Sequence, residues 1–307
     1  MPTIEEAAER IRRDRRSGAS EIARRAAIIL AVAADNARTD HALRRNMVRL
    51  GKTLLRAQPT MASLLNLVND VLLASESPRN PKERVRRVLE TFYSEQDSGP
   101  LRMAVHLARL LKRGGRLLTH SYSSSVVQTL AVLHQRNDFR TPLRVVCTES
   151  RPLLEGRNTA RQLAQIGINV TLVVDALAGE YLEQGRVDAM VVGADTVLES
   201  GLVNKCGTVG LARVAGLRKV PVFALAGRDK FLSPPLAHHI LIRSEDEAEV
   251  WPRHPSGIRL ENRYFDQTPL PLITSFVTPG GCLSPGQALK AMRSRVAHPL
   301  LAARRPQ

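Results

Sequence analysis

The strongest constraint on the fold is the alternation of short apolar segments with helical segments that begins after residue 115. The apolar segments are rich in Val, Leu and Ala, and each is followed by a segment with helical spacing of its apolar residues. Parallel strands need long crossover connections, which are usually helices. This part of the chain therefore predicts an α/β fold with a doubly wound, mostly parallel Rossmann-like sheet.

The predicted elements follow one another closely along the chain. Strands are expected at 116–120, 143–150, 169–175, 187–195, 220–227 and 270–278. Helices are expected at 123–135, 156–167, 178–185, 204–217 and 284–296. In such sheets ligands bind at the carboxyl ends of the strands, so the polar residues that follow each strand are the candidates for function.

The first part of the chain carries apolar residues at helical spacing. Helices are expected at 4–13, 19–37, 42–57, 60–75, 80–96 and 99–115, with Thr3 and Thr60 as N-caps. We therefore expect two domains, a helical N-terminal domain at 1–114 and a Rossmann-like ligand-binding domain at 115–307.

Composition excludes several classes of protein. Apolar residues make up 43% of the 307 residues, which is typical of a globular protein. The three cysteines are widely spaced, so they predict neither a disulfide framework nor a metal site and favour a reducing cytoplasm. No apolar run reaches membrane-spanning length, and no secretion signal is expected. The glycine pattern GxGxxG is absent, so NAD is not predicted.

The formal net charge of +16 can favour phosphates, RNA or an acidic partner protein. Only seven of the 45 basic residues are lysine, and an arginine bias of this kind also arises from genome composition. The basic residues of the first half are spread along helices, which is typical of solvated faces. No aromatic stacking motif accompanies them.

Asp195 ends the predicted strand at 187–195 in the stretch "MVVGADTVLESGLVNKCGTVG". A carboxylate at the end of a buried strand is poorly solvated, which raises its pKa toward a value that suits proton transfer. The alternative is that Asp195 caps the next turn or pairs with an arginine.

Asn204 and Lys205 stand at the start of the predicted helix at 204–217. Free N–H groups at a helix start, with an ammonium beside them, form a phosphate or oxyanion site. The alternative is that Asn204 is an N-cap and Lys205 a solvated lysine.

Three further strand ends carry candidate polar residues. "THSYSS" after the first strand offers serines for phosphate binding, but neighbours on a strand face opposite sides, so His120 is a poor base for Ser121. Arg151, in "TESRP", can grip a phosphate or pair with other structure. Lys230, after "ALAG", adds positive charge or is structural.

The stretches "LLTHSYSSSVV", "VCTESRPLLEGRNTARQLAQIGINVTLVVDA", "VVGADTVLESGLVNKCGTVGLA" and "RDKF" occur in one order. Together they resemble the family that joins the α/β/δ subunits of translation initiation factor 2B with methylthioribose-1-phosphate isomerase and ribose-1,5-bisphosphate isomerase. The resemblance implies isomerisation of an aldose 1-phosphate to a ketose 1-phosphate, with Asp195 as one catalytic residue and no metal or organic cofactor.

Ser121 stands where the resemblance places a catalytic cysteine. A hydroxyl is a far weaker acid than a thiol, whose pKa is about 8.5. The segment "THSYS" is more similar to the corresponding segment of the regulatory subunits.

The resemblance also implies an Arg-Gly-Ala phosphate-binding segment in the isomerases. In this chain Gly18 and Ala19 persist, while Ser17 replaces the arginine. Gln58 stands where bisphosphate isomerases have another arginine.

Two functions therefore remain open. One is a sugar-phosphate isomerase with Asp195 and Ser121 as catalytic residues. Its substrate-binding residues are expected to be Asn204, Lys205, Gly18, Ala19, Arg151 and Lys230. The other is a non-catalytic, factor 2B-like protein that senses a phosphorylated sugar or nucleotide. The resemblance also implies a homodimer, and an acidic protein or RNA partner fits the charge.

Overall fold

The computed structural model describes residues 4–14, 18–58, 61–111, 115–136 and 142–303. These residues form two compact units. Unit 1 comprises the described residues of Met1–Ser98, Gly227–Leu241 and Ala291–Gln307, and unit 2 comprises those of Gly99–Ala226 and Ile242–Lys290. The predicted domain boundary at 114/115 stays a prediction. The contacts within the chain group residues 99–111 with the sheet, and they group two later segments with the helices.

Unit 1 is built from helices that bury their alanine- and leucine-rich faces. Gly51 lets two of them approach closely, since a Cβ there would lie 2.7 Å from Cγ1 of Val68. The helices are α1 (Ile4–Arg13), α2 (Ala19–Asp35), α3 (Asp40–Ala57), α4 (Ala62–Ser75), the first part of α5 (Pro81–Leu110) and the short α11 (Pro299–Ala302).

Buried polar residues of α4 bind the two later segments of unit 1. The side-chain amide of Asn66 donates to the carbonyls of Asp229 (2.7 Å) and Phe231 (3.1 Å). The amide oxygen of Asn69 accepts from the backbone N–H of His298 (2.7 Å). Buried polar groups are stable only when they are hydrogen-bonded, so these contacts explain two buried asparagines in a helix rich in leucine and valine.

The sheet of unit 2 confirms the predicted fold class. Its strands are β1 (Arg116–Thr119), β2 (Arg144–Thr148), β3 (Asn169–Val173), β4 (Ala189–Val192), β7 (Val222–Leu225), β9 (Ser275–Thr278) and β10 (Gly281–Leu283). Their order is β10-β9-β7-β4-β1-β2-β3, and every pair is parallel except β9–β10. The order reverses between β1 and β4, as in a doubly wound sheet.

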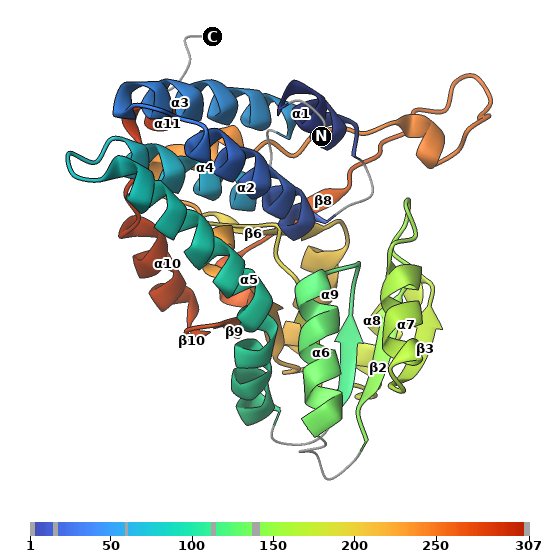
Figure 1. Cartoon of the computed structure of the whole chain (residues 1–307). Coiled ribbons are helices and arrows are strands. Elements are labelled where there is room, and N and C mark those ends of the chain that lie inside the picture. The colour runs from blue at the N-terminus through green and yellow to red at the C-terminus, as the bar shows by residue number, and fades with distance from the viewer. Residues whose placement is uncertain (1–3, 15–17, 59–60, 112–114, 137–141, 304–307) are drawn as a thin grey trace. The chain divides into compact units, whose positions relative to one another are not determined.

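Four helices lie between successive strands of unit 2 (Figure 1). They are α6 (Ser124–Arg136), α7 (Gly156–Gln165), α8 (Ala178–Glu183) and α9 (Thr208–Leu217), while α10 (Pro285–Arg293) follows the last strand, β10. The core lies where α6 and the last turns of α5 pack on the sheet, with Leu117, Leu130 and Val191 fully buried. This packing holds the carboxyl ends of β1 and β4 in fixed positions.

Three predicted helices were wrong in type or extent. Residues 80–96 and 99–115 were expected to be separate helices, but α5 runs unbroken through Gly99 and Pro100 to Leu110. The predicted helix at 204–217 begins only at Thr208. Asn204 and Lys205 instead end a strand, β6 (Gly201–Lys205), of a second sheet with β5 (Thr196–Leu198) and β8 (Phe265–Thr268). The predicted N-caps Thr3 and Thr60 lie outside the described residues.

Gly156 is expected to be the least replaceable glycine of unit 2. A Cβ at this first residue of α7 would lie 1.8 Å from the carbonyl oxygen of Thr148. Gly156→Ala should lower the free energy of unfolding by about 3 kcal/mol or more, because a backbone carbonyl cannot move aside.

Urea unfolding checks this expectation against Gly210→Ala in α9, where no atom lies within 4 Å of the added Cβ. That control should gain roughly 1 kcal/mol from helix propensity. Equal stability of Gly156→Ala and the unchanged chain would show that α7 does not pack on β2 in this way.

Candidate functional site

The candidate site lies in unit 2, where the strand order reverses. Ser121 follows β1 and Asp195 follows β4, and these two strands are parallel neighbours with Leu118 opposite Met190. Their carboxyl ends therefore meet at the same edge of the sheet, the usual ligand site of a doubly wound fold. The segments that follow the strands touch, since a Cβ on Gly193 would lie 2.5 Å from the hydroxyl oxygen of Ser123.

Asp195 lies between β4 and the second sheet. Its backbone N–H donates to the carbonyl of Val203 in β6 (3.1 Å), and the residue is half-buried. The main chain of Asp195 is thus held beside the strand that carries Asn204 and Lys205. Its catalytic role stays a prediction.

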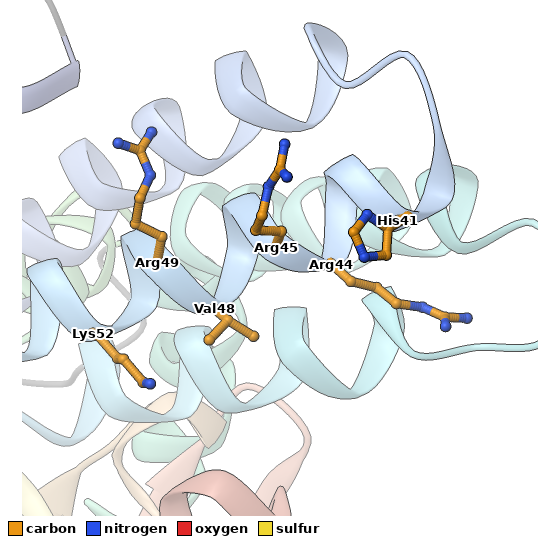
Figure 2. A pocket seen from close by; sticks show the side chains of 6 residues that line it. All are labelled: His41, Arg44, Arg45, Val48, Arg49 and Lys52. Atoms are coloured by element: carbon orange, nitrogen blue, oxygen red, sulfur yellow. The ribbon is translucent and has the colours of Figure 1, made fainter.

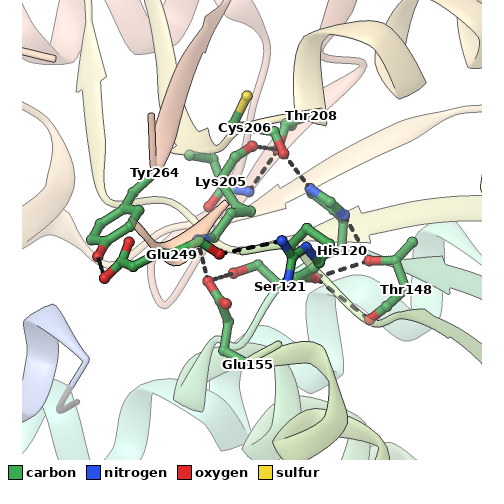
Figure 3. Close-up of polar contacts among 12 residues, drawn as sticks. His120, Ser121, Thr148, Glu155, Lys205, Cys206, Thr208, Glu249 and Tyr264 are labelled. Atoms are coloured by element: carbon green, nitrogen blue, oxygen red, sulfur yellow. Dashed lines mark hydrogen bonds and ion pairs between the residues drawn. The ribbon is translucent and has the colours of Figure 1, made fainter. Parts of the chain in front are cut away.

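Lys205 is buried, with 3% of its surface exposed, so the solvated lysine considered from the sequence is wrong. Its ammonium forms an ion pair with Glu155 (Figure 3) and lies 5.0 Å from the ring centre of Tyr264. Burial of an ammonium is tolerated only with such partners. The sequence did not single out Glu155, because an acid in a loop carries no pattern and its partner is 50 residues away.

Glu155 also reaches Ser121. The Ser121 hydroxyl donates to Oε1 of Glu155 at 3.3 Å, and Oε2 is buried without a hydrogen-bond partner among the described residues. Ser121 has a left-handed backbone with φ of 77°, a conformation that is unfavourable for residues other than glycine. Such strain persists only where surrounding contacts fix it, and it is common at functional sites.

A chain of hydrogen bonds holds Ser121 in this conformation. The Ser121 N–H donates to the Ser150 hydroxyl (2.8 Å), which lies 2.9 Å from the Thr148 hydroxyl. Thr148 is 2.7 Å from Nδ1 of His120, and Nε2 of His120 is 2.8 Å from the carbonyl of Cys206. A carbonyl can only accept, so Nε2 carries the proton and Nδ1 accepts from Thr148. His120 is therefore a buried, neutral positioning residue.

The stability of the protein is expected to fall at acidic pH because of His120. Burial lowers the pKa of His120 below its usual value of about 6.5. Between the two pKa values the unfolded chain binds more protons, so this stability is fully present above about pH 6.5 and is lost as pH falls. Urea unfolding from pH 7.5 to 5 should show a steeper pH dependence for the unchanged chain than for His120→Gln, by up to about 1.4 kcal/mol per pH unit.

His254→Gln is the control for this measurement, because His254 is exposed and the substitution removes an imidazole that lies in solvent. It should keep the pH dependence of the unchanged chain. Identical pH dependence of all three proteins would contradict the description of His120 as a buried neutral ring.

The start of α9 is occupied by a carboxylate of the protein itself. Oδ2 of Asp266 accepts from the backbone N–H groups of Gly207 (2.7 Å) and Val209 (3.2 Å). Burial raises the pKa of Asp266, although these two N–H groups favour its charged form. In this structure these two N–H groups of the helix start are therefore already hydrogen-bonded, while the phosphate-binding role considered for Asn204 and Lys205 stays a prediction. Asp266 lies in β8, about 60 residues along the chain from this turn, and no local sequence pattern identifies it.

Asn204 and Arg151 both have internal partners. The Asn204 side chain is buried and donates to the Thr208 hydroxyl (3.1 Å), which ties the end of β6 to α9. The Arg151 guanidinium donates to the carbonyls of Glu249 (3.2 Å) and Val250 (3.1 Å). The contacts of Arg151 fit the structural alternative considered from the sequence. Asn204 is not the N-cap considered there, because Gly207 is the N-cap of α9. The substrate-binding role of both residues stays a prediction.

The other predicted binding residues lie in unit 1. Gly18 is the N-cap of α2, and Ala19, its first residue, is buried. Lys230 is buried, and its ammonium is 3.7 Å from the carboxylate of Asp229. Gln58, which stands in an expected arginine position, donates to the carbonyl of Ile11 (2.9 Å) and so holds the end of α1. The role of these residues toward a ligand stays a prediction.

Unit 1 also presents a basic surface on α3. A shallow pocket there is lined by residues of one helix face, and most of these side chains are cationic (Figure 2). The residues are His41, Arg44, Arg45, Val48, Arg49 and Lys52. We call this set the α3 basic face.

Among the described residues, no helix is both long and apolar enough to cross a bilayer. The same residues contain no group of three or more His, Cys, Asp or Glu side chains arranged to hold a metal ion.

Comparison with known proteins gives one consistent result. The chain is 32% identical to the ribose 1,5-bisphosphate isomerase of Archaeoglobus fulgidus over 97% of this chain and 95% of that protein. Among solved structures, it is similar to the translation initiation factor eIF-2B of Pyrococcus horikoshii, with a TM-score of 0.77, 25% identity, and coverage of 93% and 98% of the two chains. It is also similar to the 5-methylthioribose 1-phosphate isomerase of that organism, with a TM-score of 0.72, 28% identity, and coverage of 94% and 87%.

The family model agrees with these individual matches. It covers residues 15–285, which include every predicted strand and all of the candidate site in unit 2. The chain therefore belongs to the initiation factor 2 subunit family.

Proposed function

We propose that this protein is a sugar-phosphate aldose–ketose isomerase that acts on ribose 1,5-bisphosphate or a related aldose 1-phosphate. The observation that carries the proposal is the position of Asp195 and Ser121 after the two strands that flank the reversal of strand order. Similarity to a ribose 1,5-bisphosphate isomerase over nearly the whole chain supports the same reaction.

The reaction moves two hydrogens and no net charge. The bond between C1 and the ring oxygen O4 breaks, and O4 gains a proton. The C2–H bond breaks and a C1–H bond forms, while the hydroxyl on C2 loses its proton and becomes the ketone. The reaction therefore needs groups that donate and accept protons near C1 and C2, and carboxylates suit this work.

In this proposal the carboxyl of Asp195 protonates O4 and then carries the hydrogen from C2 to C1. Lys205 binds a phosphate. Its ammonium has three N–H donors. Among the described residues, its ion-pair partner is Glu155. An ammonium in a buried position attracts a phosphate more strongly than a solvated one, because the local dielectric constant is lower.

The proposal is tested by incubating the purified protein with ribose 1,5-bisphosphate and, separately, with methylthioribose 1-phosphate. Phosphorus and carbon NMR then follow the appearance of the ketose. Conversion of either sugar supports the proposal, and preference between them identifies the substrate. No conversion of either would end it.

A second function has its own support. A serine in place of the catalytic cysteine that the family resemblance implies, and a similarity to an eIF-2B structure at 25% identity, favour a non-catalytic protein that senses a phosphorylated sugar or nucleotide. Calorimetry with both sugar phosphates, AMP and GTP distinguishes the two. Tight binding without conversion supports the sensor, and absence of binding to all four contradicts it.

A polyanionic partner, either RNA or an acidic protein, is supported by the α3 basic face. Binding of a fluorescent RNA should weaken steeply between 50 and 200 mM salt if several of these side chains contact phosphates. A negligible salt slope, with binding of poly-glutamate instead, would favour an acidic protein.

Formation of a homodimer and a cytoplasmic location both stay predictions. Analytical ultracentrifugation would measure whether the protein forms a homodimer.

A further inference from the structure

We propose that Glu155 is the second acid–base residue of the isomerase site and that it acts through the hydroxyl of Ser121. The inference rests on the proposed function and names a residue that the family resemblance did not supply. It answers the main chemical objection to that function, which is that a serine hydroxyl ionises far less readily than a thiol.

The carboxylate of Glu155 lies within hydrogen-bonding distance of the Ser121 hydroxyl. The Ser121 hydroxyl donates to Oε1 of Glu155 at 3.3 Å, and the same carboxylate forms an ion pair with the buried ammonium of Lys205 (Figure 3). A serine whose hydroxyl donates to a carboxylate can take a proton on its oxygen while it passes its own proton on. The arrangement therefore supplies Ser121 with the base that its sequence neighbours do not provide.

The surroundings of Glu155 keep it in this position. It is the N-cap residue of α7, and the next residue, Gly156, is packed against the carbonyl of Thr148. Oε2 of Glu155 is buried and has no hydrogen-bond partner among the described residues. A buried carboxylate oxygen without a donor is costly, and a donor group of a bound ligand would relieve that cost.

The proton steps balance as follows. The hydroxyl on C2 of the sugar passes its proton to Oγ of Ser121 as Ser121 passes its own to Glu155. Asp195 starts protonated and gives its proton to O4 as the C1–O4 bond breaks. Its carboxylate then moves the carbon-bound hydrogen from C2 to C1. At the end Glu155 holds one proton and Asp195 has lost one, and exchange with water restores both.

The experiment compares Glu155→Gln in two backgrounds, the unchanged chain and Ser121→Cys. A thiolate at position 121 is itself a base, so it should not need Glu155. We expect Glu155→Gln to lower kcat about 100-fold or more in the unchanged chain and less than about 10-fold in Ser121→Cys.

Glu183→Gln is the matched control, since Glu183 also forms an ion pair but with Arg218 on the surface. It should leave kcat unchanged. Because Glu155→Gln also removes the partner of Lys205, Ser121→Ala serves as a second variant that keeps this ion pair and should lower kcat to a similar extent. Thermal unfolding of each variant separates loss of activity from loss of fold.

The outcomes separate the inference from the proposed function. Turnover that survives Glu155→Gln within about threefold, or an equal loss in both backgrounds, overturns the role of Glu155 and leaves the isomerase function standing. Absence of turnover in the unchanged chain and in Ser121→Cys, although the sugar phosphate binds, overturns the isomerase function and the role of Glu155 with it.

Discussion

Asp195→Asn is expected to lower kcat for ribose 1,5-bisphosphate by about 100- to 10,000-fold, the range typical of a general acid–base residue. Asparagine has the same shape as aspartate but cannot exchange a proton at catalytic pH. The hydrogen bond from the backbone N–H of residue 195 to the carbonyl of Val203 is kept, so the loop after β4 should keep its position. Binding of the sugar phosphate, measured by calorimetry, should change less than about threefold if only proton transfer is lost.

Asp188→Asn is the matched control for this variant. Asp188 lies at the opposite, amino-terminal end of β4, where its carboxylate pairs with Arg116. The control removes a carboxylate from the same strand region without touching the candidate site. Equal kcat for Asp195→Asn and the unchanged chain would mean that another group carries the proton at O4 and C2.

Lys205→Met is expected to give the largest loss of stability among the site variants, about 3 kcal/mol in the free energy of unfolding. The methionine fills the buried space, but Glu155 keeps a largely buried carboxylate without its cation. A double variant, Lys205→Met with Glu155→Gln, should recover part of this loss, because removal of both partners leaves no unpaired charge. Urea unfolding of the two single variants and the double variant measures the coupling.

Arg218→Met provides the comparison for Lys205→Met. Its ion pair with Glu183 is about half exposed on both sides, with 51% and 45% of the side chains accessible. Exposed pairs contribute less than about 1 kcal/mol, so this variant should unfold almost like the unchanged chain. A similarly small effect of Lys205→Met, or strict additivity in the double variant, would show that the Lys205–Glu155 pair is not the buried contact described above.

Six of the seven strands of the main sheet could be predicted because each is a local apolar run. The three-residue edge strand β10 and the second sheet could not. β5 has three residues, and β6 ends in Asn204 and Lys205, whose polar side chains indicated a helix start. β6 pairs with β8 from residue 265 onward, so the evidence for it is a contact between segments about 60 residues apart.

Part of the candidate site could be inferred from the same local signals. Asp195 and Ser121 follow buried strands, so both are candidates under the rule that ligands bind at strand ends, while the family resemblance singled out Ser121 as catalytic. Glu155 and Asp266 have no such local signal. Glu155 matters because folding brings it to Lys205 and Ser121, and Asp266 because it occupies the start of α9. Pairing between distant side chains of opposite charge cannot be deduced from one sequence alone.

The central claim is that one site in unit 2, at the carboxyl ends of β1 and β4, binds and isomerises the sugar phosphate. A crystal structure of Asp195→Asn with ribose 1,5-bisphosphate tests it most directly, because slow turnover preserves the substrate. We predict C1 and C2 of the sugar between residue 195 and Ser121, with a phosphate oxygen about 3 Å from the ammonium of Lys205. A sugar phosphate bound away from these strand ends, with Lys205 still paired only with Glu155, would contradict the claim.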